Sequence, residues 1–69
     1  MNFQDMIAKR DDAARKIVGL TFDQARRIYS NIRPIMIDGV PQIVTMDMQI
    51  FRINVEIQNG IITRVDGYY

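Results

Sequence analysis

The sequence predicts a small α+β domain, with one main helix packed on a small mixed β-sheet and a long exposed loop. Three observations indicate this class. A capping-box helix start occurs at residues 21–24, an alternating strand pattern occupies residues 51–58, and an Asn-Gly turn follows at residues 59–60. A chain of 69 residues has room for one domain.

The first element expected is an extra helix at the N-terminus. Apolar residues recur there at roughly helical spacing, which predicts a helix over residues 3–16 that Gly19 breaks. A helix of this length is marginal in water unless it docks on something. We treat residues 1–16 as a helical extension and residues 17–69 as the remainder of the single domain.

The main helix is predicted over residues 22–31. Thr21 can accept a hydrogen bond from the first turn, and Gln24 three residues later completes a capping box. Asp23 lies in the first turn, where it favours the helix dipole. Pro34 disfavours helical geometry in the residue before it and should end the helix.

Three strands are expected after this helix. Residues 35–37 form a short apolar strand, which suggests burial on both faces or a central position in the sheet. The turn chemistry of residues 38–41 opens a long loop over residues 38–51. Residues 52–58 and 61–65 then form an antiparallel hairpin around a type I′ turn at Asn59-Gly60.

The composition argues against an enzyme. The chain has neither cysteine nor histidine, which excludes a disulfide and the usual catalytic dyads and triads. The acidic residues lack EF-hand spacing, and there is no glycine-rich phosphate loop. The sequence therefore predicts a protein that is not an enzyme and that uses no cofactor and no metal.

The net charge of +1 gives no general attraction to nucleic acid. Basic residues are more frequent before residue 34, but acidic residues lie between them, which is more typical of a solvated helix surface. No apolar run approaches the roughly 18 residues of a membrane span, and no signal peptide is visible. We expect neither a nucleic-acid nor a membrane partner, and either a cytoplasmic protein or a mature secreted chain.

The long loop contains the pattern that points most clearly to a function. Thr45 and Asp47 flank Met46, and both side chains can accept hydrogen bonds. Arg52 offers five donors in a fixed fork and can brace the loop from the strand below, where Asn54 on the same face can add a neutral donor. A rigid extended segment of this kind is what a protease inhibitor presents to an active site.

These residues, taken together, resemble a known family. The matching positions are Val18-Gly19 before Thr21, Ala25-Arg26, the run from Val44 to Asp47, the run from Arg52 to Val55, Ile61 and Val65. In order and spacing they are similar to the potato inhibitor I family of serine-protease inhibitors, which includes the barley chymotrypsin inhibitors and eglin. They are also similar to the related small bacterial subtilisin and elastase inhibitors. The resemblance spans about residues 17–67.

The resemblance implies a role for each loop residue. Met46 would be the P1 residue that enters the specificity pocket, with Thr45 at P2, Asp47 at P1′ and Met46–Asp47 as the reactive bond. Val44 and Met48 would complete the reactive loop. The implied partner is a subtilisin-, chymotrypsin- or elastase-like serine protease, since an unbranched apolar side chain suits their pockets.

The same resemblance implies how the loop is supported. Arg52 matches the arginine that braces the loop from below. Asn54 stands where plant members usually carry a second arginine, although the bacterial inhibitors resemble this chain in having Asn there. We therefore expect one fewer charged side chain supporting the loop, and a somewhat looser loop.

Several alternatives stay open from the sequence. Met46 could fold back onto the domain, Arg52 could pair with Glu56 along the strand, and Asn54 could serve only the sheet edge. Tyr68 and Tyr69 suggest a packing or frayed terminus rather than a site. The chain could also be a non-inhibitory interaction module that binds a host protein, or a second copy as a homo-oligomer, through residues 1–16 or a sheet edge.

Overall fold

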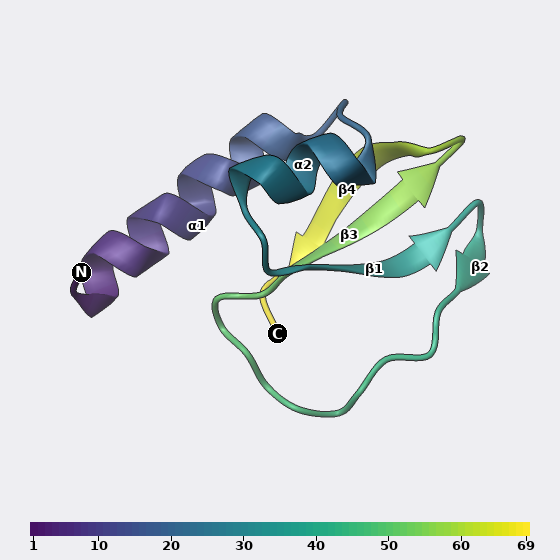
Figure 1. Cartoon of the computed structure of the whole chain (residues 1–69). Coiled ribbons are helices and arrows are strands. Elements are labelled where there is room, and N and C mark those ends of the chain that lie inside the picture. The colour runs from purple at the N-terminus through teal and green to yellow at the C-terminus, as the bar shows by residue number, and fades with distance from the viewer.

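The computed structural model describes residues 1–69 and has the α+β architecture that the sequence predicts (Figure 1). No helix is both long enough and apolar enough to cross a membrane. The elements in chain order are α1 (Phe3–Ile17), α2 (Phe22–Ile28), β1 (Ile32–Ile37), β2 (Val40–Pro41), β3 (Ile53–Gln58) and β4 (Ile61–Gly67).

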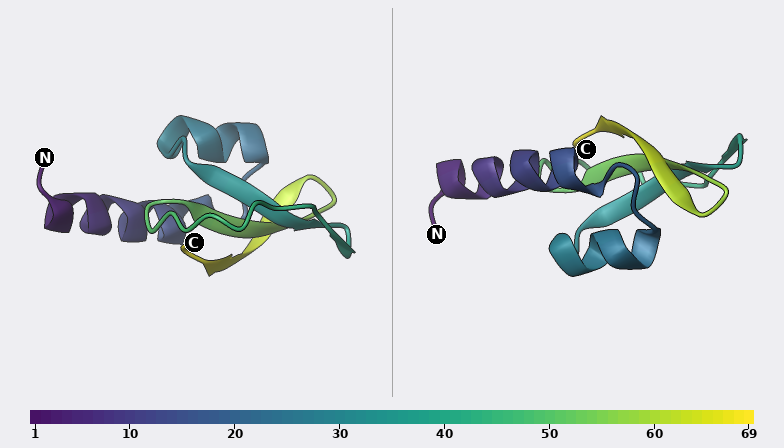
Figure 2. Two further views of the ribbon diagram at one scale, coloured as in Figure 1. Left: turned by 90° about the horizontal axis from the view of Figure 1, so that it is seen from below. Right: turned by 90° about the horizontal axis from the view of Figure 1, so that it is seen from above.

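The four strands form one mixed sheet in the order β2-β1-β3-β4. The central pair, β1 and β3, is parallel, and both outer pairs are antiparallel. Figure 2 shows α2 on one face of the sheet, while α1 and the loop between β2 and β3 stay near the level of the sheet. The parallel central pair matters for the site because it places the starts of β1 and β3 side by side.

Helix α1 confirms the predicted N-terminal helix. The side chain of Asn2 caps its first turn by accepting a hydrogen bond from the Asp5 N–H at 2.8 Å. Its last two turns contribute Ala13, Ala14 and Ile17 to the hydrophobic core. The segment treated as an extension in the sequence therefore takes part in the core, while its first two turns project away from the sheet (Figure 1).

Helix α2 begins as predicted but ends earlier. Both bonds of the capping box are present, from the Gln24 N–H to Thr21 Oγ1 at 3.2 Å and from the Thr21 N–H to Gln24 Oε1 at 3.0 Å. The predicted end at residue 31 is wrong, because Tyr29 is already extended. The chain must leave the helix there so that the carbonyl of Asn31 can accept a hydrogen bond from the Ile53 N–H at 2.9 Å and start the parallel strand pair.

Strand β1 is longer than predicted. It begins at Ile32 rather than at residue 35, and it contains Pro34 in its interior. The pairing with β3 shifts its register between Pro34 and Met36, and such an irregularity lets an interior strand accommodate a residue without an N–H. The strand does have a central place in the sheet, but Ile32 is its only buried residue and the others are partly exposed.

The turn after β1 is shorter than predicted. Val40 and Pro41, which the sequence assigns to a turn and loop, form the edge strand β2 and pair with Ile37 and Met36. The loop is therefore shorter than the predicted 38–51 and covers residues 42–52, which we call the 42–52 loop. The β3–β4 hairpin has the predicted turn, with positive φ at both Asn59 and Gly60.

The two faces of β3 are both buried at its start. Ile53, Val55 and Ile57 point into the core, as the alternation predicts. The strand begins at Ile53 rather than at residue 52. On the other face Asn54 is completely buried, and Arg52 just before the strand is only 8% exposed. These two polar side chains lie beneath the 42–52 loop.

Candidate functional site

The candidate site is the 42–52 loop, which crosses from β2 to β3 as a wide arc (Figure 1). Met46 lies in this arc with its side chain 96% exposed, so it does not fold back onto the domain. Met48 is also exposed, and Val44 is half-buried. The structure shows no pocket and no cluster of metal-ligating side chains.

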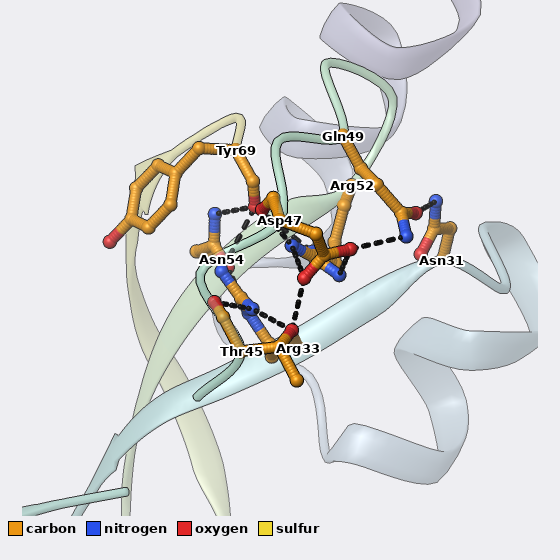
Figure 3. A network of polar contacts seen from close by, with 8 residues as sticks. All are labelled: Asn31, Arg33, Thr45, Asp47, Gln49, Arg52, Asn54 and Tyr69. Atoms are coloured by element: carbon orange, nitrogen blue, oxygen red, sulfur yellow. Dashed lines mark hydrogen bonds and ion pairs between the residues drawn. The ribbon is translucent and has the colours of Figure 1, made fainter. Parts of the chain in front are cut away.

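Arg52 braces the loop from below, as the sequence predicts (Figure 3). Its Nη2 donates to the main-chain oxygen of Asp47 at 3.0 Å, and its Nη1 lies 3.3 Å from the Asp47 carboxylate. The alternative pairing with Glu56 does not occur, because that carboxylate faces Arg64 at 3.7 Å. Because Arg52 is buried, its guanidinium holds the loop from a fixed position.

A second arginine reaches the loop from the neighbouring strand. Nη1 of Arg33, in β1, lies 3.3 Å from both the carbonyl oxygen and the hydroxyl of Thr45. Nε of Arg33 donates to the side-chain oxygen of Asn54 at 2.8 Å. The loop therefore has a second charged brace, contrary to the expectation of one fewer strut, and it comes from a residue that the sequence analysis did not single out.

Asn54 supports the second brace rather than the loop itself. Its side-chain oxygen accepts from Arg33, and its Nδ2 donates to the main-chain oxygens of Gly67 and Tyr69 at 3.3 and 3.1 Å. An amide can do both at once because it carries an acceptor and a donor. The interpretation that Asn54 serves only the sheet edge is thus wrong.

The main-chain oxygen of Tyr69 lies at the centre of the network (Figure 3). It accepts from Arg33 Nη2 at 3.0 Å and from Arg52 Nε at 2.9 Å, in addition to Asn54. The ring of Tyr69 also lies 5.5 Å from the guanidinium of Arg33. This residue, assigned to a packing or frayed terminus from the sequence, fixes the two arginines relative to each other.

The two arginines are joined through the loop side chains. The hydroxyl of Thr45 accepts from Arg33 and donates to the carboxylate of Asp47, which in turn faces Arg52. Gln49 donates to the same carboxylate at 2.9 Å and lies 3.5 Å from Asn31. The main chain is therefore held on both sides of the Met46–Asp47 peptide bond, while the Met46 side chain stays free.

The network changes the acid–base behaviour of Asp47. Hydrogen bonds from the Thr45 hydroxyl, the Gln49 amide and the Arg52 guanidinium hold the pKa of the Asp47 carboxyl well below its usual range. The carboxylate in this chain is thus an acceptor that stays ionised. An acceptor of this kind can anchor a loop, whereas a general acid would need a raised pKa.

This pKa shift gives a prediction about pH. Because the pKa of Asp47 is lower in the folded than in the unfolded protein, its ionised carboxylate adds to the free energy of unfolding. This contribution is complete above the unfolded pKa of about 3.9 and is lost as the pH falls through the lower pKa of the folded state. We expect the carboxyl ¹³C shift of Asp47 to stay constant as the pH falls from about 7 to about 3.9, where an ordinary aspartate is already half protonated. In Thr45→Val, which removes one donor, its midpoint should rise. The same midpoint in both proteins would contradict the hydrogen bond.

The link between Arg33 and the loop support is visible in the strand register and not in the sequence. In the parallel pair of β1 and β3, Arg33 lies directly opposite Asn54. Arg33 therefore lies beside position 54, where plant members of the resembling family usually carry a second arginine and this chain has Asn54. The register of a parallel pair depends on tertiary contacts, so the sequence alone could not pair the two residues.

Comparisons with known proteins add one relative. No family model and no solved structure matches the chain. Over 45 residues, 65% of this chain, it is 51% identical to uncharacterized protein R610 of Acanthamoeba polyphaga mimivirus. The matched segment is 14% of that viral protein, so the chain spans only a small part of its length. The chain is therefore similar to a segment of a larger viral protein whose printed name states no activity.

Proposed function

We propose that this protein is a serine-protease inhibitor that presents the 42–52 loop to the enzyme as a substrate would. The observation that carries the proposal is the environment of one peptide bond. Met46 is almost fully exposed, while its two neighbours, Thr45 and Asp47, are each held by an arginine. The resemblance to the potato inhibitor I family supports the same assignment from the sequence.

The proposed mechanism depends on rigidity. An extended segment bound by main-chain hydrogen bonds loses little conformational entropy if it is already fixed in the free protein. After cleavage of the Met46–Asp47 bond, Arg33 would keep hold of Thr45 on one side, and Arg52 would keep hold of Asp47 on the other. The new ends would stay close together, which favours resynthesis of the bond over release.

The exposed side chain of Met46 suggests which class of protease the loop would bind. Methionine is apolar, flexible and unbranched, so it fits the hydrophobic pockets of subtilisin-, chymotrypsin- and elastase-like proteases. Trypsin-like proteases require a cation at this position and should bind poorly. The proposed target is thus a serine protease with an apolar specificity pocket.

An activity titration tests the proposal. The purified protein is added to subtilisin, chymotrypsin and elastase, and we expect stoichiometric inhibition of at least one of them, with Kd of about 1 nM or below. Mass spectrometry of long incubations should find slow cleavage only between Met46 and Asp47. Progressive cleavage of the loop without inhibition would show that the protein is only a substrate. If all three enzymes keep their full activity, the proposal is rejected.

A non-inhibitory interaction module is the second candidate. The observation that favours it is a set of exposed apolar side chains in the first turns of α1 and just before it, namely Met1, Phe3 and Met6. Such side chains could contact a partner protein or another copy of the chain. Failure to inhibit any of the three proteases would favour this candidate.

A further inference from the structure

The first helix contacts the 42–52 loop at a point that the two other arginines do not reach. Arg10, in the middle of α1, donates from Nη1 to the main-chain oxygen of Ile50 at 2.8 Å. Its Nε and Nη2 both donate to one carboxylate oxygen of Asp11, at 3.0 and 2.8 Å. The guanidinium carbon lies 3.7 Å from the centre of the Tyr68 ring.

This geometry fixes the Arg10 guanidinium. The side chain is only 12% exposed, although Arg10 belongs to a helix whose other charged residues are mainly solvated. A carboxylate on one edge and an aromatic ring against one face fix the plane of the guanidinium and thereby the direction of Nη1. Nη1 points at the loop and donates to the Ile50 oxygen. The arrangement is more specific than a surface ion pair, since three different groups hold one side chain.

Two neighbouring contacts hold the next residue of the loop, Phe51. The hydroxyl of Tyr29, just after α2, donates to the main-chain oxygen of Phe51 at 2.6 Å. The ring of Phe3 packs edge-on against the ring of Phe51, with centroids 5.6 Å apart. Two consecutive carbonyls at the end of the loop are therefore bound by side chains from or next to the two helices.

These contacts lie on the part of the loop that follows the proposed reactive bond. Arg33 and Arg52 hold residues 45 and 47, on either side of the proposed reactive bond. The limb that returns to β3 after this bond includes residues 48–51, and Arg10 and Tyr29 hold its last two carbonyls. In a cleaved loop this limb carries the new N-terminus, so its mobility decides how long that end stays near Met46.

We propose that Arg10 is a positioning residue that clamps the returning limb of the 42–52 loop, and that α1 is thereby part of the inhibitory device. The proposal rests on the proposed function, because it assigns residues 1–16 a role in keeping the cleaved ends together. The clamp itself, however, is a property of the free protein. It can therefore be tested without any protease.

The test compares Arg10→Met with Arg15→Met, a matched change on the same helix. Arg15 is an exposed side chain whose recorded polar contact is Asp12 at 3.5 Å within α1. In ¹⁵N relaxation of the free protein, Arg10→Met should increase backbone mobility at residues 48–51 and leave the hairpin turn at 59–60 unchanged. Arg15→Met should behave like the wild type. Unchanged mobility in Arg10→Met would overturn the proposal.

Inhibition supplies the second readout. We expect Arg10→Met to weaken inhibition and to speed cleavage at Met46–Asp47, each by about tenfold, since it removes one charge-assisted hydrogen bond to the loop. If the wild type inhibits no protease but mobility still rises in Arg10→Met, the proposed function fails and the clamp stands. If mobility rises while inhibition and cleavage stay at wild-type values, the clamp has no inhibitory role and the proposal fails.

A milder variant keeps the test valid if Arg10→Met does not fold. Asp11→Ala removes the carboxylate that orients the guanidinium, and this carboxylate is 41% exposed, so its loss leaves the core intact. The same rise in mobility at residues 48–51 is expected, at smaller amplitude. A uniform rise across the whole chain would indicate general destabilisation and would reject a local clamp.

Discussion

Replacing Met46 by lysine is expected to turn the protein from an inhibitor of subtilisin- and chymotrypsin-like enzymes into an inhibitor of trypsin. The Met46 side chain is almost fully exposed, so the change should not disturb the loop. A buried ammonium in an apolar pocket lacks a partner, whereas the trypsin pocket supplies a carboxylate. We expect a loss of about 100-fold or more against subtilisin and a comparable gain against trypsin.

The matched control is Met48→Lys. Met48 is also exposed and lies two residues further along the loop, so the substitution adds the same charge to the same surface. It should confer no stoichiometric inhibition of trypsin. Equal trypsin inhibition by both variants would mean that general electrostatic attraction, and not entry of residue 46 into the pocket, sets the preference. Unchanged specificity in Met46→Lys would mean that Met46 is not the P1 residue.

Replacing Arg52 by alanine is expected to convert the inhibitor into a better substrate. The change removes the donors to both the main chain and the carboxylate of Asp47, and it leaves the oxygen of Tyr69 without one of its partners. We expect inhibition to weaken and loop cleavage to accelerate, each by about 10- to 100-fold. The free energy of unfolding should fall by about 1–3 kcal/mol, since Arg52 is a buried donor to the main-chain oxygen of Tyr69.

Two further variants separate bracing from general stability. Arg64→Ala removes an exposed arginine that faces Glu56 and Asp66, and such surface pairs contribute about 0–1 kcal/mol. It should inhibit as the wild type does. Arg52→Lys keeps the charge but loses the planar fork, so it should lie between the wild type and Arg52→Ala. Wild-type inhibition and cleavage rates in Arg52→Ala would show that the loop needs no brace from this side.

The support of the loop is divided among three arginines from three different parts of the chain. Arg33 comes from β1, Arg52 precedes β3, and Arg10 comes from α1. The first two meet at the main-chain oxygen of Tyr69, while the third acts at the far end of the loop. Because each arginine binds a different stretch, loss of one should loosen the loop locally rather than release it entirely.

Much of the fold could be predicted from local patterns. The capping box at Thr21, the alternation along residues 53–57 and the Asn59-Gly60 turn are each correct in the structure. These features depend on hydrogen bonds and dihedral preferences within a few residues, which the chain sets before it folds further. The brace predicted for Arg52 follows for the same reason, since Arg52 lies within six residues of Asp47. The exposure of Met46 was implied only by the family resemblance, because local spacing left open that its side chain folds back.

The two errors have different origins. Local chemistry predicted that Pro34 would end a helix, but α2 had already ended at Ile28 because the chain had to become extended and pair with β3. There a tertiary hydrogen bond overrode a local preference, and such bonds cannot be inferred from neighbours in sequence. Val40 and Pro41, by contrast, pair with β1 across the two-residue Asp38-Gly39 turn, so strand β2 belongs to a local hairpin whose Asp-Gly signal was interpreted only as the opening of a loop.

The sequence by itself therefore determined the fold class, the presence of a long loop and its first brace, because these depend on short-range spacing. The folded structure decided which other groups support that loop. Arg33 lies 12 residues before Thr45, Tyr69 lies 17 residues after Arg52, and Arg10 lies 40 residues before Ile50. A guanidinium can find an acceptor anywhere within its reach, so its partner is set by the packing of strands and helices and not by its place in the sequence.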